Sequence, residues 1–211
     1  MICAIVLAAG RSRRMGAQKL LLPFGGKTVI AHIVDQLLAS TIDEVHVVVG
    51  CQAKRISREL SSRPVSIVNN SNYKSGMLSS VRCGLGDLPK QCRAVLVVLG
   101  DQPSITTKLI DKMLQAFAAT EKRILVPLYQ DKRGHPILFS ELYRNEILTH
   151  YDNVGLRGLL HAHTDDVFEL TVSTSAVLSD MDCPEDYRRE IALLEKKHQT
   201  ETRLEDRSTY H

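Results

Sequence analysis

Short, continuous runs of Val, Ile and Leu recur along this chain and limit the folds that it can adopt. The runs lie at residues 2–8, 45–49, 65–68, 94–99 and 124–128. Because each run is continuously apolar rather than alternating, the predicted strands are covered on both faces, as in a parallel sheet. Stretches with helical spacing separate them, at residues 27–39, 53–60, 76–86 and 106–119. This alternation predicts a doubly wound, mostly parallel α/β fold whose ligands bind beyond the carboxyl ends of the strands.

After about residue 130 the alternation of apolar runs and helical stretches is less regular. Residues 135–139 and 166–172 predict strands at the edge of the sheet, and helices are expected at 140–148 and 155–162. Pro184 suits the first turn of a final helix that ends near Leu194. The polar residues beyond it predict a disordered tail. We therefore expect one domain over residues 1–195 and a tail over residues 196–211.

Composition and charge narrow the classes of function. Of 211 residues, 44% are hydrophobic, which is enough for one well-buried domain. A net charge of +3 is too small for a nucleic-acid-binding surface, and no apolar run approaches the roughly 20 residues that span a membrane. The five cysteines are scattered without a C-x-x-C pair, which argues against a disulfide framework or a structural zinc site. We expect a cytoplasmic protein without nucleic-acid or membrane partners.

One segment near the start is a false phosphate-binding signal. Gly26-Lys27-Thr28 resembles the end of a P-loop, but that motif requires glycine where this chain has Leu21. The segment before it is also too apolar to wrap phosphates. A turn followed by the start of a helix is the favoured interpretation.

A second segment, "LAAGRSRRMGAQK" at residues 7–19, has the parts of a triphosphate-binding loop. Its small residues allow close approach of the backbone, and successive N–H groups can form an anion nest. Charge-assisted hydrogen bonds to phosphate oxygens can come from Arg11, Arg13, Arg14 and Lys19. A basic surface turn is the alternative. The dinucleotide fingerprint G-x-G-x-x-G is absent, which argues against a dinucleotide-dependent redox enzyme.

Two acidic residues follow apolar segments. Asp101 comes directly after the run "VLVVLG", where a carboxylate can hold Mg²⁺ beside phosphates bound after the first strand. The alternative is a turn or cap residue. Asp182, in "DMDCPEDY", is either the N-cap of the last helix or a second metal ligand.

Five motifs in order carry a family resemblance over nearly the whole chain. They are "LAAGRSRRMGAQK", "GMLSSVRCGL" (76–85), "GDQP" (100–103), "RGHP" (133–136) and "DMDCPEDY" (180–187). Together they resemble the molybdopterin nucleotidyltransferase family, and most closely its molybdenum cofactor cytidylyltransferases. The resemblance implies a three-layer α/β/α nucleotidyltransferase fold of the nucleotide-diphospho-sugar transferase type.

The resemblance also implies site residues. The nucleotide would be bound by Ala8, Ala9, Gly10, Arg11, Ser12, Gly16, Lys19, Gly76, Ser79 and Ser80. Catalysis would depend on Arg14, Lys19 and Asp101, and Asp101 and Asp182 would bind Mg²⁺. The acceptor would face Arg133, Gly134, His135 and Arg157. Position 183 is Cys where such families often have Thr, which places the local helix cap in question.

The implied reaction transfers CMP from CTP to the phosphate of molybdopterin and releases pyrophosphate. Guanylyl-transferring relatives carry "LAGG", so the methyl group of Ala9 is expected to favour cytosine over guanine. A molybdenum hydroxylase is the expected client, in transient contact. The alternatives are guanylyl or cytidylyl transfer to another phosphorylated acceptor, and a non-catalytic molybdopterin carrier.

Three further residues carry no predicted role in the reaction. Cys3 and Cys83 are expected to be small buried hydrophobes, and His46 an ordinary strand residue.

Overall fold

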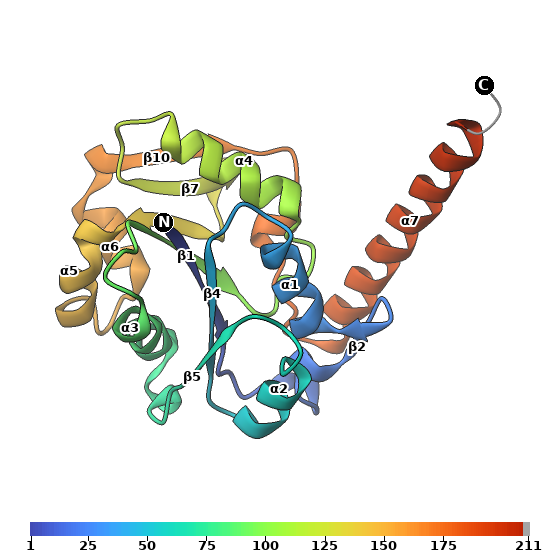
Figure 1. The fold of residues 1–211 in the computed structure, drawn as a ribbon, viewed down its shortest axis with the longest axis horizontal. Coiled ribbons are helices and arrows are strands. Elements are labelled where there is room, and N and C mark those ends of the chain that lie inside the picture. Colours follow the sequence, from blue (N-terminus) through green and yellow to red (C-terminus); the bar gives the residue numbers. More distant parts are fainter. Residues whose placement is uncertain (209–211) are drawn as a thin grey trace.

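A mixed β-sheet forms the centre of the protein, with helices on both of its faces (Figure 1). This computed structural model describes residues 1–208, apart from the side chains of Arg13 and of residues 197–208. The strands are β1 (Ile2–Ala8), β2 (Pro23–Phe24), β3 (Lys27–Thr28), β4 (Glu44–Val49), β5 (Ser66–Asn69), β6 (Ala94–Leu99), β7 (Ile124–Tyr129), β8 (Lys132–Arg133), β9 (Ile137–Ser140) and β10 (Val167–Thr171). The helices are α1 (Val29–Leu38), α2 (Ala53–Glu59), α3 (Met77–Asp87), α4 (Thr107–Ala118), α5 (Arg144–Thr149), α6 (Leu156–Ala162) and α7 (Pro184–Ser208).

The strand order confirms the predicted fold class. Across the sheet it is β5-β4-β1-β6-β9-β7-β10, with β8 beside β7. β1 pairs in parallel with both β4 and β6, and β5 and β10 also pair in parallel with their neighbours. Only the β8 and β9 pairings in this sheet are antiparallel within the described part of the chain. The result is a doubly wound, mostly parallel sheet in a three-layer α/β/α arrangement.

Alternate residues of β1 face opposite layers, which explains why the run is continuously apolar. Ala4 and Val6 pack in the core shared with α1, α2 and α4. Cys3 and Ile5 pack in the core shared with α3, α5 and α6. Burying a Val, Leu or Ile side chain contributes about 1.5–3 kcal/mol, so a central strand covered on both faces stabilises both layers.

The P-loop look-alike is a hairpin followed by a helix start, as predicted. β2 and β3 form a small antiparallel pair, and Gly25 and Gly26 in its turn have positive φ angles. The Thr28 side chain then caps α1 by accepting the Ala31 N–H at 3.3 Å.

Two predictions for the second half of the chain were wrong. The strand predicted at the edge over 135–139 is β9, which lies inside the sheet, antiparallel to both β6 and β7. Ile137, Leu138 and Phe139 are all buried, as an interior position requires. The final helix does not end near Leu194, because the α7 backbone stays helical to Ser208 and projects from the rest of the protein (Figure 1). The expected tail over 196–211 lies partly in this helix, and its residues 209–211 are outside the described residues.

The carboxyl ends of β1 and β6 approach each other closely, and this positions the loops that follow them. The Gly100 N–H donates to the Leu7 carbonyl at 3.1 Å. A Cβ at position 100 would lie 2.7 Å from that same oxygen, so only glycine fits here without a shift of the chain. Asp101, the next residue, is thereby held beside the loop that follows β1.

In the described part of the chain, every helix is too short or too polar to cross a lipid bilayer.

Candidate active site

A cavity of about 520 Å³ opens at the carboxyl ends of β1 and β6; we call it the strand-end cavity. Segments from distant parts of the chain line it: the loop after β1, the start of α3, Asp101 and the segment before α7. Its lining residues are Leu7, Ala9, Gly10, Arg11, Ser12, Arg14, Lys19, Leu20, Tyr73, Gly76, Met77, Ser80, Leu99, Asp101, Asp180 and Asp182. Most of the residues predicted for the nucleotide and the metal are therefore brought together.

The loop after β1 is held in shape by its own side chains. Ser12, in the left-handed region with φ 50°, donates its hydroxyl to Gln18 Oε1 at 2.6 Å. The same hydroxyl oxygen accepts the Lys19 N–H at 3.2 Å, and Gln18 Nε2 donates to the Gly10 carbonyl at 3.3 Å. The loop is thus closed between its start and its end, which fixes the direction in which Lys19 leaves it. No motif or periodicity in the sequence indicates this role of Gln18.

Lys19 joins the two acidic residues that the sequence proposed as metal ligands. Its Nζ lies 2.5 Å from Asp101 Oδ2 and 3.0 Å from Asp182 Oδ1. Arg14 Nη2 adds a contact of 2.7 Å to Asp182 Oδ2. Two carboxylates that contact one ammonium group are close enough to share a single cation. Lys19 is mostly buried, whereas Arg14 is open to solvent.

The ionisation of this cluster follows from its geometry. Burial alone would lower the pKa of Lys19, but Asp101 and Asp182 outweigh it and raise the pKa above its usual value. The hydrogen bond from Lys19 lowers the pKa of Asp182 against the effect of burial, and Arg14 adds to the shift. At neutral pH the ammonium is protonated and Asp182 is ionised.

Asp180 is a further acidic group in the cavity, for which the motifs predicted no role. It lines the cavity near Asp101, and Gln102 Nε2 donates to its Oδ1 at 2.8 Å. Burial, followed by the negative charge of Asp101, raises the pKa of Asp180. Asp180 follows an apolar segment and lies two residues before Asp182, and this position in the sequence could have indicated that it belongs to the site.

The start of α3 lines the opposite side of the cavity. Gly76 precedes it with φ 99° and ψ 178°, a conformation that requires glycine. Ser80 lines the cavity, but Ser79 lies in a separate hollow next to Asn72. The Ser79 hydroxyl contacts the Asn72 and Gly76 carbonyls, at 3.1 and 2.8 Å. Buried Asn70 donates to both serine hydroxyls at 3.0 Å, which fixes the first turn of the helix.

Tyr73 and Met77 add an apolar wall that the motifs did not reveal. The Arg11 guanidinium lies 5.7 Å from the centroid of the Tyr73 ring, a cation–π contact. Ala9 is buried, and a Cβ at position 50 would lie 2.7 Å from Tyr73 and 2.9 Å from the Ala9 methyl group, so Gly50 separates the two side chains closely. Besides Ser79, two more predicted nucleotide-binding residues lie outside the cavity lining: Ala8 is buried at the end of β1, and Gly16 lines an adjacent hollow.

The predicted acceptor residues lie apart from this lining. Arg133 Nε contacts Glu169 Oε1 at 2.6 Å, between β8 and β10. Gly134 packs against Val177, whose carbonyl oxygen would lie 2.2 Å from a Cβ at position 134. The requirement for glycine in "RGHP" therefore has a packing explanation.

His135 lies closer to the cavity carboxylates than Arg133 does. Burial lowers the pKa of His135 to about 4; Asp101 opposes this effect and Arg157 adds to it. The half-buried imidazole therefore interacts with both charged groups and is neutral at pH 7. Of the four predicted acceptor residues, His135 is the one with an interaction that connects it to Asp101.

The cavity combines a loop of small and basic residues with two neighbouring carboxylates. This combination defines a nucleotide-binding α/β protein suited to phosphoryl chemistry. Comparison with known families agrees with that class. Residues 4–167 match the model of the MobA-like NTP transferase domain, and the chain belongs to this nucleotidyltransferase family.

Individual relatives show how far the similarity extends. Molybdenum cofactor cytidylyltransferase of Escherichia coli K12 is 24% identical over 187 residues, which cover 88% of this chain and 93% of the relative. Nicotine blue oxidoreductase of Paenarthrobacter nicotinovorans is 29% identical over 148 residues, 66% of this chain and 71% of the relative. The crystal structure of Rv0371c from Mycobacterium tuberculosis H37Rv superposes with a TM-score of 0.81 at 29% identity, covering 90% of this chain and 97% of that one. A further crystal structure of Rv0371c is a complex with manganese.

Proposed function

We propose that this protein transfers CMP from CTP to the terminal phosphate of molybdopterin, with or without molybdenum, and releases pyrophosphate. The acceptor oxygen forms a bond to the α-phosphorus while the bond between the α-phosphorus and the bridging oxygen breaks. Family membership supports nucleotidyl transfer. The choice of CTP and molybdopterin rests on the motif resemblance and on similarity to the Escherichia coli cytidylyltransferase.

One observation carries the proposal: Asp101 and Asp182 converge on one position beside the loop after β1. Lys19 Nζ contacts an oxygen of each, at 2.5 and 3.0 Å, so a single positive charge already bridges the pair. Carboxylate oxygens are the donors that Mg²⁺ prefers, so these residues fit a divalent cation. Bound between them, Mg²⁺ would neutralise phosphate oxygens and the developing charge on pyrophosphate.

The protein's own groups perform the remaining work. Lys19 and Arg14 neutralise the triphosphate, and the loop closed by Ser12 and Gln18 presents backbone N–H groups to it. The acceptor is already an anion, so positioning and electrostatics are needed rather than a strong general base. We assign the acceptor side to the neutral imidazole of His135, which interacts with Asp101, and to the Arg157 guanidinium, which interacts with His135. A molybdenum hydroxylase client would meet the product only in transient contact.

The test is direct formation of a pterin dinucleotide. The protein is incubated with molybdopterin, Mg²⁺ and each nucleoside triphosphate in turn, and both the dinucleotide and pyrophosphate are measured. We expect CTP to be the best donor. Asp101→Asn should reduce turnover by at least about 100-fold, the range seen when one electrostatic transition-state contact is removed. Asp131→Asn, in an exposed turn whose φ of 60° asparagine tolerates, is the matched control and should retain full activity.

Other outcomes separate the alternatives. A higher rate with GTP than with CTP would indicate guanylyl transfer. If pyrophosphate were released only with another phosphorylated acceptor, that compound and not molybdopterin would be the acceptor. Binding of molybdopterin without pyrophosphate release would indicate a carrier. One similar protein is named an oxidoreductase. The absorption spectrum of a nicotinamide cofactor is therefore recorded after incubation with the protein, and we expect it to remain unchanged.

A further inference from the structure

A cluster of metal-ligand side chains lies at the amino-terminal end of the sheet, opposite to the strand-end cavity. β1 and β4 pair in register, so that Cys3 is beside Glu44 and Ile5 is beside His46. Glu44 and His46 are two residues apart and share one face of the sheet. One ligand atom from each of Cys3, Glu44 and His46 lies within 4.8 Å of the others.

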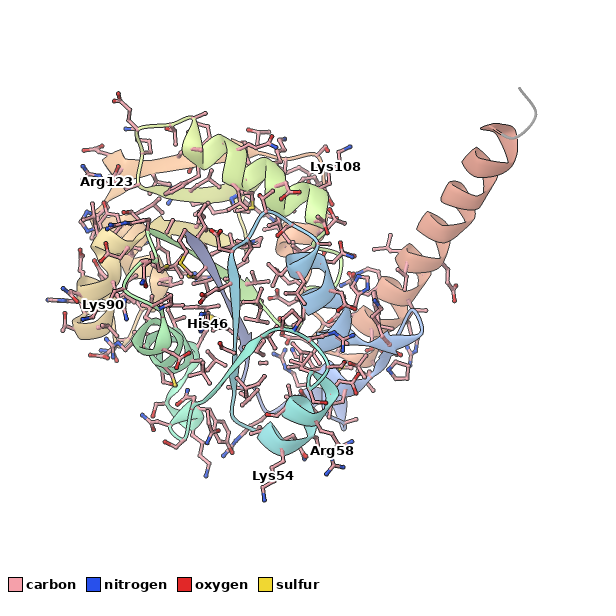
Figure 2. The ribbon with its side chains drawn as sticks, in the orientation of Figure 1. His46, Lys54, Arg58, Lys90, Lys108 and Arg123 are labelled. Atoms are coloured by element: carbon pink, nitrogen blue, oxygen red, sulfur yellow. The ribbon has the colours of Figure 1, made fainter. Side chains whose placement is uncertain are left out.

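His46 is held in a fixed orientation inside this cluster. It is only 3% exposed, and Figure 2 labels it on β4, on the side of the strand that faces α3. Its Nδ1 lies 2.9 Å from Asp87 Oδ2 at the end of α3, and its Nε2 lies 3.1 Å from Glu44 Oε2. A histidine that binds a metal through one nitrogen usually donates the other N–H to a carboxylate, which is the arrangement of His46 and Asp87.

A second sulfur lies beside the first. The Cys3 thiol is a neighbour of the thiol of Cys92, in the loop before β6. Both cysteines are buried, at 0% and 1% exposure, and neither forms a disulfide. The Cys92 thiol donates to the Ala94 carbonyl at 3.2 Å and lies outside the group of converging ligand atoms. The donors around one point are therefore the Cys3 sulfur, an imidazole nitrogen and a carboxylate oxygen.

We propose that Cys3, His46 and Glu44 bind one thiophilic divalent cation, with Zn²⁺ as the best match. Thiolate, imidazole and carboxylate donors suit Zn²⁺, which can take three protein ligands and a water in the fourth position. The cation would lie between His46 Nε2 and Glu44 Oε2, which are 3.1 Å apart, and the Cys3 thiol proton would pass to solvent. The Glu44 and Asp87 side chains are each 45% exposed, which leaves an entry path.

Such a site would link β1 and β4 at the end of the sheet away from the reaction. Its ligands are scattered along the sequence, so no spacing motif reveals them. Their convergence depends on the parallel register of β1 and β4. The site is independent of the proposed function, because it shares no residue with the strand-end cavity.

Titration of the reduced, metal-free protein with Co²⁺ tests the proposal. Co²⁺ bound to thiolates gives a near-ultraviolet charge-transfer band, and tetrahedral coordination gives intense visible bands. We expect both bands with one equivalent of Co²⁺, and their loss when Zn²⁺ is added. Cys3→Ser should abolish the charge-transfer band or weaken it strongly. Asp87→Asn should weaken Co²⁺ binding by about 10–100-fold, the usual effect of removing such a supporting carboxylate.

Two further variants control for misfolding of Cys3→Ser and for the loss of a thiol outside the cluster. Glu44→Gln is a surface change that should leave the fold intact and still weaken Co²⁺ binding, even if Cys3→Ser fails to fold. Cys83→Ser removes a half-buried thiol outside the cluster and should leave the bands unchanged. Zn²⁺ should also raise the melting temperature of the wild type but not of Glu44→Gln. The absence of thiolate bands in the wild type, or bands that Cys3→Ser and Glu44→Gln leave unchanged, would overturn the assignment.

Discussion

The carboxylate of Asp186 accepts the backbone N–H of Asp182 at 3.0 Å, and that of Cys183 at the same distance. Asp186 lies in the first turn of α7 and reaches back to cap it, as the acidic member of a capping box does. The Cys183 thiol also donates to this carboxylate, at 3.1 Å, so cysteine takes part in the cap at the position where the family resemblance led us to expect threonine. The N-cap alternative for Asp182 is therefore wrong, and its carboxylate is left to contact Lys19 and Arg14.

Replacing the cap should affect both stability and the metal ligand that it holds. We expect Asp186→Ala to lower the free energy of unfolding by about 1 kcal/mol, the usual cost of losing a helix cap. Because the backbone of Asp182 is released, Mn²⁺ binding in the presence of nucleotide should weaken as well. Urea denaturation and calorimetric titration measure the two effects. Glu185→Ala, on the same turn and exposed, is the control. Equal results for the two variants would show that the cap does not position Asp182.

The sequence predicts the strands of the parallel half of the sheet well, because burial on both faces leaves a continuous apolar run. It fails for β9. That strand has four residues, and neither its central place nor its antiparallel direction can be derived from so short an apolar run. Its place depends on pairing with both β6 and β7, which are contacts between segments distant in sequence. The end of α7 was also missed, because a polar sequence does not distinguish a projecting helix from an irregular tail.

The candidate site could be predicted as far as topology and charge allow. A carboxylate at the end of β6 must lie near the loop after β1, because neighbouring parallel strands end at the same edge. The role of Gln18 depends instead on a left-handed turn at Ser12, which no periodicity reveals. Arg133 resembled an acceptor ligand, but in the structure it pairs with Glu169, a partner visible only once β8 and β10 are placed.

Lys19 bridges the carboxylates that we assign to the metal, so the ammonium and a divalent cation compete for them. We expect Lys19→Met to tighten Mn²⁺ binding to the nucleotide-free protein by about tenfold, equivalent to about 1.4 kcal/mol. The same change should weaken CTP binding, because a phosphate contact is lost. Electron paramagnetic resonance of free Mn²⁺ and calorimetry with CTP measure the two changes.

In the wild type, a bound triphosphate that attracts Lys19 away from the two carboxylates would strengthen cation binding. Thermodynamic linkage then requires the bound cation to strengthen triphosphate binding by the same factor. Lys27→Met, which removes an ammonium paired with Asp35 elsewhere, should change neither affinity. Weaker Mn²⁺ binding by Lys19→Met would contradict the competition.

The methyl group of Ala9 is the proposed determinant of the base. Ala9 is 5% exposed and lines the strand-end cavity, as Tyr73 does. We expect Ala9→Gly to shift the preference from CTP towards GTP by about 1–3 kcal/mol, the scale of discrimination by one methyl group in an apolar pocket. Dissociation constants for both nucleotides give the result. If both change by the same factor, the methyl group supports the loop but does not select the base.

Stability at acid pH should depend on Asp35, which lies on α1 away from the cavity. Arg63 contacts both of its carboxylate oxygens, at 2.6 and 3.1 Å, and Lys27 contacts one of them at 2.6 Å. The hydrogen bonds from Arg63 lower the pKa of Asp35 against the effect of burial, and Lys27 adds to the shift. As pH falls, Asp35 is therefore protonated in the unfolded chain at a higher pH than in the folded protein. The stabilisation is present above the ordinary pKa of about 3.9 and is lost as pH falls through the lower pKa of the folded state.

Asp35→Asn should therefore lower the free energy of unfolding at pH 7 by about 1 kcal/mol, the upper range for a partly exposed ion pair. The difference from the wild type should narrow below about pH 4, because there the wild type also loses the charge. Urea denaturation between pH 2.5 and pH 7 would follow this change. Asp131→Asn, in an exposed turn, should give a curve that stays parallel to the wild type. A difference between Asp35→Asn and the wild type that stays constant down to the lowest pH would mean that the charge of Asp35 does not stabilise the fold.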